Sequence, residues 1–312
     1  MERLKIKMFT GKKIAVLCGG DGQEREVSLR SGKAVCDALN EAGFNAAVID
    51  LHSMNEIGIV KNFEGVFVAM HGDWGEGGIL QAKLEEMKIP FTGSGSKASA
   101  LAMNKIKACE LFKNNGIKIP DGLVWSDEPE KIISALGRSL VVKPSSGGST
   151  VGITILKNAD KENLISAVKT AQESYKGEVL IEKYIDGREI TAAVWERGGE
   201  TEALPLIEII PHHGFYDYTN KYTKGATEYI VPAKIDSQNA KLISETAVKA
   251  HKVLNCSGYS RADFRLSEDG AYILEVNTAP GMTATSLVPK AAAAVGVSMP
   301  EFVKAVMQMA NC

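Results

Sequence analysis

Two short segments near the C-terminus bring together residue types that bind divalent cations. Arg261 and Asp263 alternate along one predicted strand, and Glu275 and Asn277 alternate along the next. Because strand side chains point to opposite faces in turn, the members of each pair share one side. The turn between them, 268–270, contains an Asp-Gly step that is typical of hairpins, so the two polar faces should meet.

Oxygen ligands arranged in this way suit magnesium, whose remaining ligands are usually water and phosphate. Residues two apart on a strand lie roughly 7 Å apart, so Glu275 is able to bridge two cations about 4 Å apart. The alternative is a salt-bridged hairpin surface. Glu275 lies between Leu274 and Val276, however, and a partly buried carboxylate needs a partner or a metal. We therefore expect Asp263, Glu275 and Asn277 to bind the metal of a magnesium nucleotide.

Residues that can bind the nucleotide itself occur in the middle of the chain. Lys143 ends an apolar stretch immediately before a loop rich in Ser and Gly, 145–150. Amides in such a loop can hold a phosphate, although the order of residues is not that of a P-loop. The alternative is a surface loop after an edge strand. Glu182 and Lys183 end another strand, where backbone groups can contact an adenine edge and Glu189 a ribose; taken alone, a solvated strand end explains them better.

Three further positions lie where chain turns follow predicted strands. Glu24 follows the glycine-rich segment 19–22, which lacks the G-x-G-x-x-G spacing of a dinucleotide loop. Glu24 is therefore either a fixed anion in a crevice or a helix-capping carboxylate. His71 follows an apolar strand, where a buried and satisfied histidine is the default. Gly281 lies in a strand-to-helix turn whose amides can attract an anion; taken alone, an ordinary turn explains this segment better.

The composition indicates a soluble globular protein of two or three domains. The 312 residues are 45% hydrophobic and 24% charged, with a formal net charge of -2. This balance provides no positive field for nucleic acid or an anionic membrane. We find no secretory signal and no membrane-spanning segment. Five scattered cysteines, an odd number without a C-x-x-C pair, favour reduced thiols in the cytoplasm and argue against a zinc site.

Strand and helix patterns divide the chain into three domains. Residues 1–94 alternate strand and helix, which predicts a parallel sheet with helices on both faces. Residues 95–183 and 184–312 predict two α+β domains, the first beginning with a single long helix over 96–115. The expected strands include 202–210, and the expected helices include 161–174 and 240–254. The polar stretch 212–227 is long for a connection and is expected to be a lid.

Taken together, these motifs resemble the D-alanine:D-alanine ligases of the ATP-grasp superfamily, from about residue 13 to residue 309. The segments that carry the resemblance are Glu24-Arg-Glu-Val-Ser-Leu29, Met70-His-Gly72, Thr92-Gly-Ser-Gly95, Val142-Lys-Pro-Ser145, Phe215-Tyr-Asp-Tyr218, Glu275-Val-Asn-Thr278 and Pro280-Gly-Met-Thr283. The implied fold mixes α/β and α+β. It has an N-terminal parallel-sheet domain that binds substrate, plus central and C-terminal α+β domains that clamp ATP.

The resemblance also implies residue roles. Lys105 and Lys143 would hold the α- and β-phosphates of ATP and Lys221 the γ-phosphate. Four further residues would line the adenosine pocket: Glu182, Lys183, Ile185 and Glu189. Two Mg²⁺ ions, with Mn²⁺ as a substitute, would bind Asp263, Glu275 and Asn277.

The remaining implied roles concern the two amino acids. Glu24 would pair with the ammonium of the first D-alanine, with His71 near its carboxyl end. Arg261 and the Gly281 amide would stabilise the oxyanion. Ser286 and the Leu287 amide would hold the second carboxylate, while Ser149 and Tyr222 would join Glu24 in a set that closes loops over the site.

The implied reaction is ATP-dependent ligation of two D-alanines through D-alanyl phosphate, for peptidoglycan precursors, by a cytoplasmic homodimer. Tyr222 indicates dipeptide formation, because phenylalanine at that position accompanies ester formation with D-lactate. The alternatives are a ligase that takes D-serine or D-lactate second, or a nucleotide sensor without turnover. Three residues depart from the family pattern without removing a catalytic group: Gly77, Asn104 and Gly147.

Overall fold

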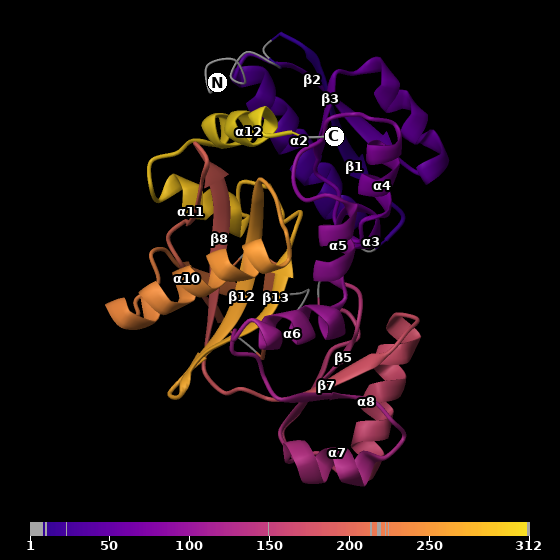
Figure 1. Ribbon diagram of the computed structural model, residues 1–312, viewed down its shortest axis with the longest axis vertical. Coiled ribbons are helices and arrows are strands. Elements are labelled where there is room, and N and C mark those ends of the chain that lie inside the picture. Colours follow the sequence, from indigo (N-terminus) through magenta and orange to yellow (C-terminus); the bar gives the residue numbers. More distant parts are fainter. Residues whose placement is uncertain are drawn as a thin grey trace.

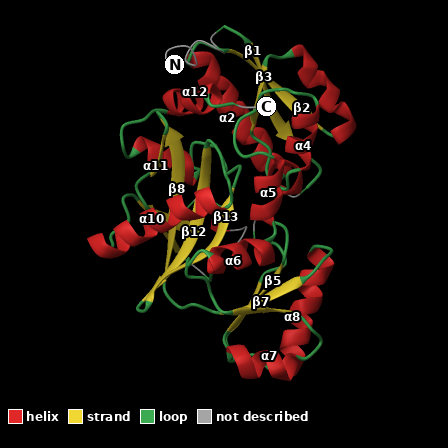
Figure 2. Cartoon of the chain, in the orientation of Figure 1, coloured by secondary structure: helices red, strands yellow, loops and turns green. Residues whose placement is uncertain are grey.

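Three separate β-sheets lie along the length of the molecule, each with its own helices (Figure 1; Figure 2). The computed structural model describes residues 9, 11–22, 24–148, 150–212, 214–216, 220–221, 223 and 225–310. The expected mixture of α/β and α+β architecture is confirmed, because a parallel N-terminal sheet is followed by two antiparallel sheets.

The N-terminal sheet is parallel, with the strand order β2-β1-β3. Val16 in the central strand pairs with Val48 on one side and Phe67 on the other. The interior of the central strand is apolar and buried, as expected when both faces of a parallel sheet are covered. The elements are β1 (Lys13–Gly19), α2 (Arg25–Glu41), β2 (Asn45–Leu51), the 3-10 helix η1 (Met54–Asn62), β3 (Gly65–Val68), α3 (Gly72–Glu76) and α4 (Ile79–Glu86).

The central sheet is antiparallel, with the order β4-β7-β5-β6. Its inner strand β5 carries Lys143, which therefore does not end an edge strand. Helix α8 matches the predicted range because Asp160 and Asn163 form a capping box at its start. The elements are β4 (Gly122–Val124), α7 (Pro129–Leu136), β5 (Leu140–Pro144), β6 (Thr154–Leu156), α8 (Lys161–Ser174) and β7 (Val179–Lys183).

The C-terminal sheet has the order β11-β10-β8-β12-β13, with β9 paired to β8. The single strand expected over 202–210 is wrong, because Pro205 has no N–H to donate and separates β9 from β10. The elements are β8 (Arg188–Arg197), β9 (Glu200–Ala203), β10 (Ile207–Pro211), β11 (Thr227–Ile230), α10 (Ser237–Val253), β12 (Tyr259–Ser267), β13 (Gly270–Asn277), α11 (Leu287–Ala293) and α12 (Met299–Gln308).

The segment 96–115 forms two helices rather than the single helix expected. Helices α5 (Ser96–Met103) and α6 (Lys105–Asn114) meet at Asn104, whose backbone is extended. The Asn104 side chain accepts a hydrogen bond from the Lys107 amide at 3.0 Å and caps the second helix. This break sets the direction of Lys105, the first residue of α6.

Apolar cores join these sheets to elements from other parts of the chain. One core packs β1 and α2 against β8, β12, α11 and α12, with the Trp195 and Phe302 rings 4.9 Å apart. Figure 1 shows α12, in yellow, beside α2. A second core packs Ala108 and Phe112 of α6 against β8 and β12. The central sheet has a core of its own with α7 and α8. The domain boundaries at 94/95 and 183/184 stay a prediction.

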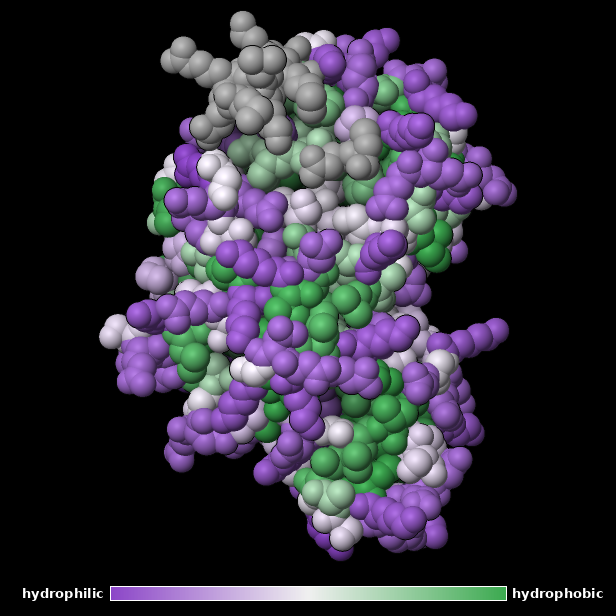
Figure 3. Space-filling model, viewed as in Figure 1, coloured by the Kyte–Doolittle hydropathy of each residue, from purple (hydrophilic) through white to green (hydrophobic). Residues whose placement is uncertain are grey.

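The face of the molecule seen in Figure 3 is mainly hydrophilic. Figure 3 shows hydrophilic side chains over most of one face, with apolar patches between them. Among the described helices, none combines the length and apolarity needed to cross a membrane. The four cysteines in the described ranges are free and buried.

Candidate functional site

Strands β12 and β13 form the predicted hairpin and place its polar residues opposite one another. Asp263 pairs with Glu275 and Arg261 pairs with Asn277 across the two strands. The register shifts immediately after Asp263, where a bulge ends the regular pairing. The hairpin therefore brings two carboxylates, one amide and one guanidinium to one end of the sheet.

Asp263 is the centre of this hydrogen-bonded group. Its Oδ1 accepts from Arg261 Nε at 2.9 Å and from Thr191 Oγ1 at 2.6 Å. Its Oδ2 accepts from Arg261 Nη2 at 2.7 Å and from Asn277 Nδ2 at 3.2 Å. A planar guanidinium bound through two nitrogens holds the carboxylate in one orientation, which leaves Arg261 Nη1 for another acceptor.

Glu275 lies among cations. Its Oε2 is 3.6 Å from Lys105 Nζ, which also donates to the Gly147 carbonyl at 2.6 Å. Burial alone would raise the pKa of Glu275, but Lys105, Lys221, Lys143 and Arg261 lower it to about 2. Glu275 is therefore ionised at every physiological pH and is available as a ligand.

The two acidic residues and the amide fit a hard divalent cation. All three carry oxygen donors, and each acid lies beside a cation: Asp263 beside Arg261 and Glu275 beside Lys105. Within the described ranges no group of three or more His, Cys, Asp and Glu side chains is placed to hold a metal, so further ligands would come from water and phosphate. The surplus of lysines around Glu275 favours an anionic partner, such as a polyphosphate.

Lys143 and Glu182 form a buried ion pair at 2.6 Å between neighbouring strands β5 and β7. Burial opposes the charged form of Lys143, but the Glu182 carboxylate raises the pKa of its ammonium. The alternative of a solvated strand end is therefore wrong for Glu182, whereas Lys183 beside it is exposed. The Lys183 amide donates to the Asp121 carbonyl at 2.8 Å, and Glu189 pairs with Arg265 at 3.2 Å.

A cavity of about 580 Å³ joins residues from the two ends of the chain. Its lining combines residues near the N-terminal sheet with residues of the C-terminal sheet and α11. Nine of the predicted site residues line it: Glu24, His71, Lys221, Arg261, Glu275, Asn277, Gly281, Ser286 and Leu287. Lys105 lines an adjoining smaller cavity with Glu275 and Asn277. The predicted adenosine residues Lys183, Ile185 and Glu189 line neither of these two cavities.

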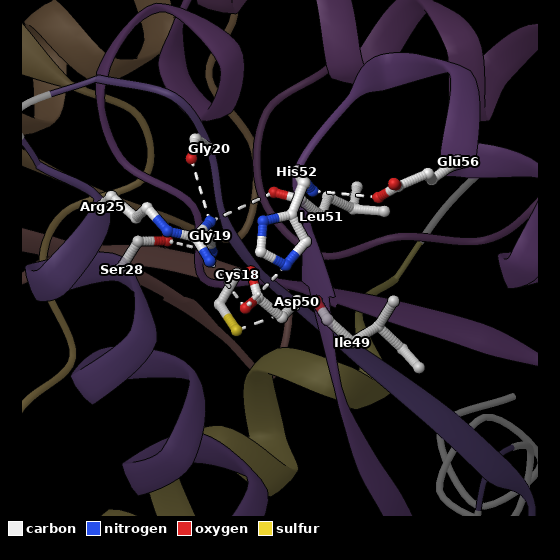
Figure 4. Close-up of polar contacts among 10 residues, drawn as sticks. All are labelled: Cys18, Gly19, Gly20, Arg25, Ser28, Ile49, Asp50, Leu51, His52 and Glu56. Carbon is white, nitrogen blue, oxygen red and sulfur yellow. Dashed lines mark hydrogen bonds and ion pairs between the residues drawn. The ribbon is translucent and has the colours of Figure 1, made fainter.

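The loop before α2 positions Glu24 at the wall of this cavity. The Glu24 side chain makes no capping hydrogen bond, so the capping alternative is wrong. Arg25 next to it donates to the carbonyls of Gly20 at 3.0 Å and Leu51 at 3.5 Å, and binds Asp50 at 2.7 Å (Figure 4). Gly19 packs against Asp50 so closely that a Cβ would overlap the carboxylate, which explains a glycine there.

The cavity contains residues that the sequence analysis missed. Glu76 is buried and accepts from the Gly72 amide at 3.1 Å. Burial and the nearby Glu24 raise its pKa to about 8. Tyr216 and Tyr229 join through their hydroxyls at 3.1 Å, and Lys290 lies over the Tyr229 ring. The sequence signal for close packing at Glu76 is the pair of glycines that flank it, because a Cβ on Gly75 or Gly77 would overlap backbone atoms.

His71 is buried, as its default interpretation required, and also lines the cavity. Ser286 is the N-cap residue of α11, and its hydroxyl accepts from the Thr283 amide at 3.0 Å. Two predicted site residues, Ser149 and Tyr222, lie outside the described residues.

Comparisons with known proteins agree on one family. Residues 117–308 match the family model described as D-ala D-ala ligase C-terminus. The D-alanine–D-alanine ligase of Anaeromyxobacter dehalogenans is 43% identical over 302 residues, which cover 95% of this chain and 96% of that relative.

Solved structures of similar chains cover the same length. The D-alanine–D-alanine ligase of Bacillus anthracis complexed with ATP is 32% identical with a TM-score of 0.84, covering 96% of this chain and 97% of that one. The VanG D-Ala:D-Ser ligase of Enterococcus faecalis is also 32% identical, with a TM-score of 0.81 and coverage of 96% and 99%.

Proposed function

Because the chain belongs to the D-alanine–D-alanine ligase family, we propose that it joins two D-alanine molecules into D-alanyl-D-alanine for peptidoglycan precursors. The reaction consumes ATP and releases ADP and phosphate. The observation that carries the proposal is the cavity that unites Glu24, Arg261 and Ser286 beside a cluster of lysines.

The first step transfers phosphate to the first D-alanine. Glu24 binds its ammonium, and the carboxylate attacks the γ-phosphate in line to give D-alanyl phosphate. Lys105, Lys143 and Lys221 offset the negative charge of the phosphates, which is the main contribution of protein to phosphoryl transfer. The family roles of Lys105 and Lys143 at the α- and β-phosphates agree with their position around Glu275.

Asp263, Glu275 and Asn277 are the residues that would hold two Mg²⁺ ions, for which Mn²⁺ can substitute. When bound, Mg²⁺ neutralises charge on the transferring group and its leaving oxygen. The donor set supports this proposal, since Glu275 stays ionised and Asp263 is oriented by Arg261. Glu182, Lys183, Ile185 and Glu189 would surround the adenosine.

The second step forms the peptide bond. The deprotonated amine of the second D-alanine attacks the acyl carbon, and phosphate leaves. Arg261 and the Gly281 amide stabilise the oxyanion, each donor contributing about 3 kcal/mol in comparable sites. Ser286 and the Leu287 amide hold the second carboxylate. Water would hydrolyse the acyl phosphate and must therefore be excluded from the site. We propose that the loop containing Ser149 and the loop 212–227 close over the site, and that Ser149, Tyr222 and Glu24 hold them closed.

We further propose a cytoplasmic homodimer that binds neither membrane nor nucleic acid. The similarity to both a D-alanine–D-alanine and a D-Ala:D-Ser ligase makes the second substrate the main question. Tyr222 favours D-alanine over D-lactate, on the family pattern.

The test is identification of the product by mass, with D-alanine, D-serine and D-lactate competing in the presence of ATP and Mg²⁺. Stoichiometric ADP, phosphate and D-alanyl-D-alanine are the expected products. A mixed dipeptide or an ester as the main product would show that the second substrate is D-serine or D-lactate rather than D-alanine. If no phosphate is released above background, the protein is not a ligase and the nucleotide-sensor alternative remains.

A further inference from the structure

Two buried residues of the N-terminal part of the chain contact the loop that carries Gly281. Ser31 on α2 and His71 after β3 lie 2.9 Å apart, between Oγ and Nε2. The Nδ1 atom of His71 is 3.1 Å from the Ala279 carbonyl oxygen. The Met282 amide donates to Ser31 Oγ at 3.3 Å. The two contacts bracket Pro280 and Gly281 from both ends.

For a neutral imidazole, only one assignment of protons satisfies all of these contacts. A carbonyl oxygen can only accept, so Nδ1 of His71 carries the hydrogen. The Nε2 atom of a neutral imidazole then accepts, and the Ser31 hydroxyl donates to it. The Ser31 oxygen remains free to accept from the Met282 amide, which completes the chain of bonds.

The surroundings of His71 keep the ring neutral. Burial lowers the pKa of His71; the nearby Glu24 and the contact to Ala279 oppose this effect, and Arg261 adds to it. Glu76, which lines the same cavity, is itself held in its protonated form by burial near neutral pH. Both ring nitrogens are engaged by protein groups, so neither is directed at a substrate proton.

We propose that Ser31 and His71 are positioning residues that hold the loop 279–282 and thereby aim the Gly281 amide at the oxyanion of the second step. A Cβ on Gly281 would lie 4.0 Å from His71 Nε2 and 2.9 Å from Ser286 Oγ, so the ring packs directly on this loop. The inference rests on the role of the Gly281 amide in the proposed ligase reaction.

The first experiment measures the proton position directly and does not depend on activity. In ¹⁵N spectra of the full-length unliganded protein, His71 should show the neutral Nδ1–H tautomer from about pH 5.5 to about pH 8.5. Its signal is assigned by its loss in His71→Gln, among the five histidines of the chain. An Nε2–H tautomer, or titration near the ordinary value of about 6.5, overturns the proposal.

The second experiment separates the two chemical steps. Ser31→Ala should lower kcat for dipeptide formation on the order of 10- to 100-fold, as expected when a reacting geometry is misplaced. The KM for ATP and for the first D-alanine should not change. Exchange of ¹⁸O between the bridging and nonbridging positions of ATP, which reports the first step, should keep its wild-type rate. Ser31→Thr retains the hydroxyl and should recover most of kcat.

Ser99→Ala is the matched control. Ser99 is as buried as Ser31, but among the described residues its hydroxyl donates only to the nearby Ser94 carbonyl, at 3.3 Å. An equal loss of kcat in Ser99→Ala, an unchanged kcat in Ser31→Ala, or loss of isotope exchange overturns the positioning role. If the wild-type enzyme forms no dipeptide, the proposed ligase function is disproved instead. The proton assignment of His71 is still tested by the ¹⁵N spectra, which do not depend on activity.

Discussion

Two carboxyl groups in the same cavity have pKa values that are shifted in opposite directions. Burial raises the pKa of each, but Glu275 also faces four cations and Glu76 faces Glu24. The same residue type is therefore charged at one position and protonated at the other near neutral pH. At the residue scale, neighbouring charges rather than side-chain chemistry decide which group can bind a metal.

Glu275→Gln tests the metal assignment. The variant keeps the shape of the side chain but loses one negative charge, so turnover should fall by at least about 100-fold while the thermal unfolding midpoint stays within a few degrees. Phosphate release and calorimetry measure the two quantities. Glu268→Gln, in the exposed turn of the same hairpin, is the control and should behave as wild type. Near-normal turnover in Glu275→Gln would remove Glu275 from the metal site.

Glu76→Gln tests the raised pKa through the pH dependence of stability. Between the ordinary value of 4.5 and about 8, the folded protein binds a proton that the unfolded chain has lost. The free energy of unfolding of the wild type should therefore fall as pH rises through this window, by about 1.4 kcal/mol per pH unit relative to the variant. Denaturant titrations without ATP at several pH values measure the difference. A difference that is independent of pH contradicts the shifted pKa.

At the element scale, the Ser/Gly loop after β5 is held by the end of α8. A Cβ on Gly147 would lie 2.4 Å from the Tyr175 ring, and the Gly147 φ is +103°. Glycine at position 147 departs from the family pattern, and the structure gives a reason: the Tyr175 ring occupies the space that a larger side chain at 147 would need. The contact orders the loop whose Gly147 carbonyl accepts from Lys105.

Gly147→Ala should raise the KM for ATP by on the order of 10-fold, because the methyl group displaces Tyr175 and the loop. Gly137→Ala is the matched control, since Gly137 has a similar positive φ of +83° but nothing within 4 Å of a Cβ. It should carry only backbone strain, with a lower unfolding midpoint and an unchanged KM. The double change Gly147→Ala with Tyr175→Ala should relieve part of the effect. Equal KM values in both single variants would contradict the contact.

At the scale of the whole molecule, the cavity lies between parts of the chain that share apolar cores. The core formed by α2, α12 and β8 fixes the N-terminal sheet against the C-terminal sheet. The core of α6 with β8 and β12 does the same for the segment that begins at Lys105. A ligand that contacts both parts should therefore stabilise the fold as a unit.

ATP with Mg²⁺ should raise the unfolding free energy by about 2.7 kcal/mol at a concentration 100 times its Kd. Thermal unfolding with ATP alone, and with ATP, Mg²⁺ and excess EDTA, separates the metal-dependent part. That part should be missing in Glu275→Gln. A full shift without divalent metal would contradict the ligand role of Asp263, Glu275 and Asn277.

Much of the molecule follows from local sequence. The apolar runs of β1 and β5, the capping residues of α8 and the Asp-Gly turn of the hairpin act within a few residues, so their elements were predictable. The failures are also local in origin: Asn104 and Pro205 each break an element that hydrophobic pattern alone would continue.

The assembled site depended on the tertiary structure. Glu24, Ser28 and Ser31 follow the spacing of one helix face, which marks a polar stripe, but the sequence does not show what that stripe contacts. Ser31 bonds to Met282, 251 residues away, and His71 to Ala279, 208 residues away. Likewise the protonation of Glu76 depends on its burial beside Glu24. Such contacts and pKa values arise only when distant segments pack together and exclude water. Local sequence patterns do not determine which distant segments pack together.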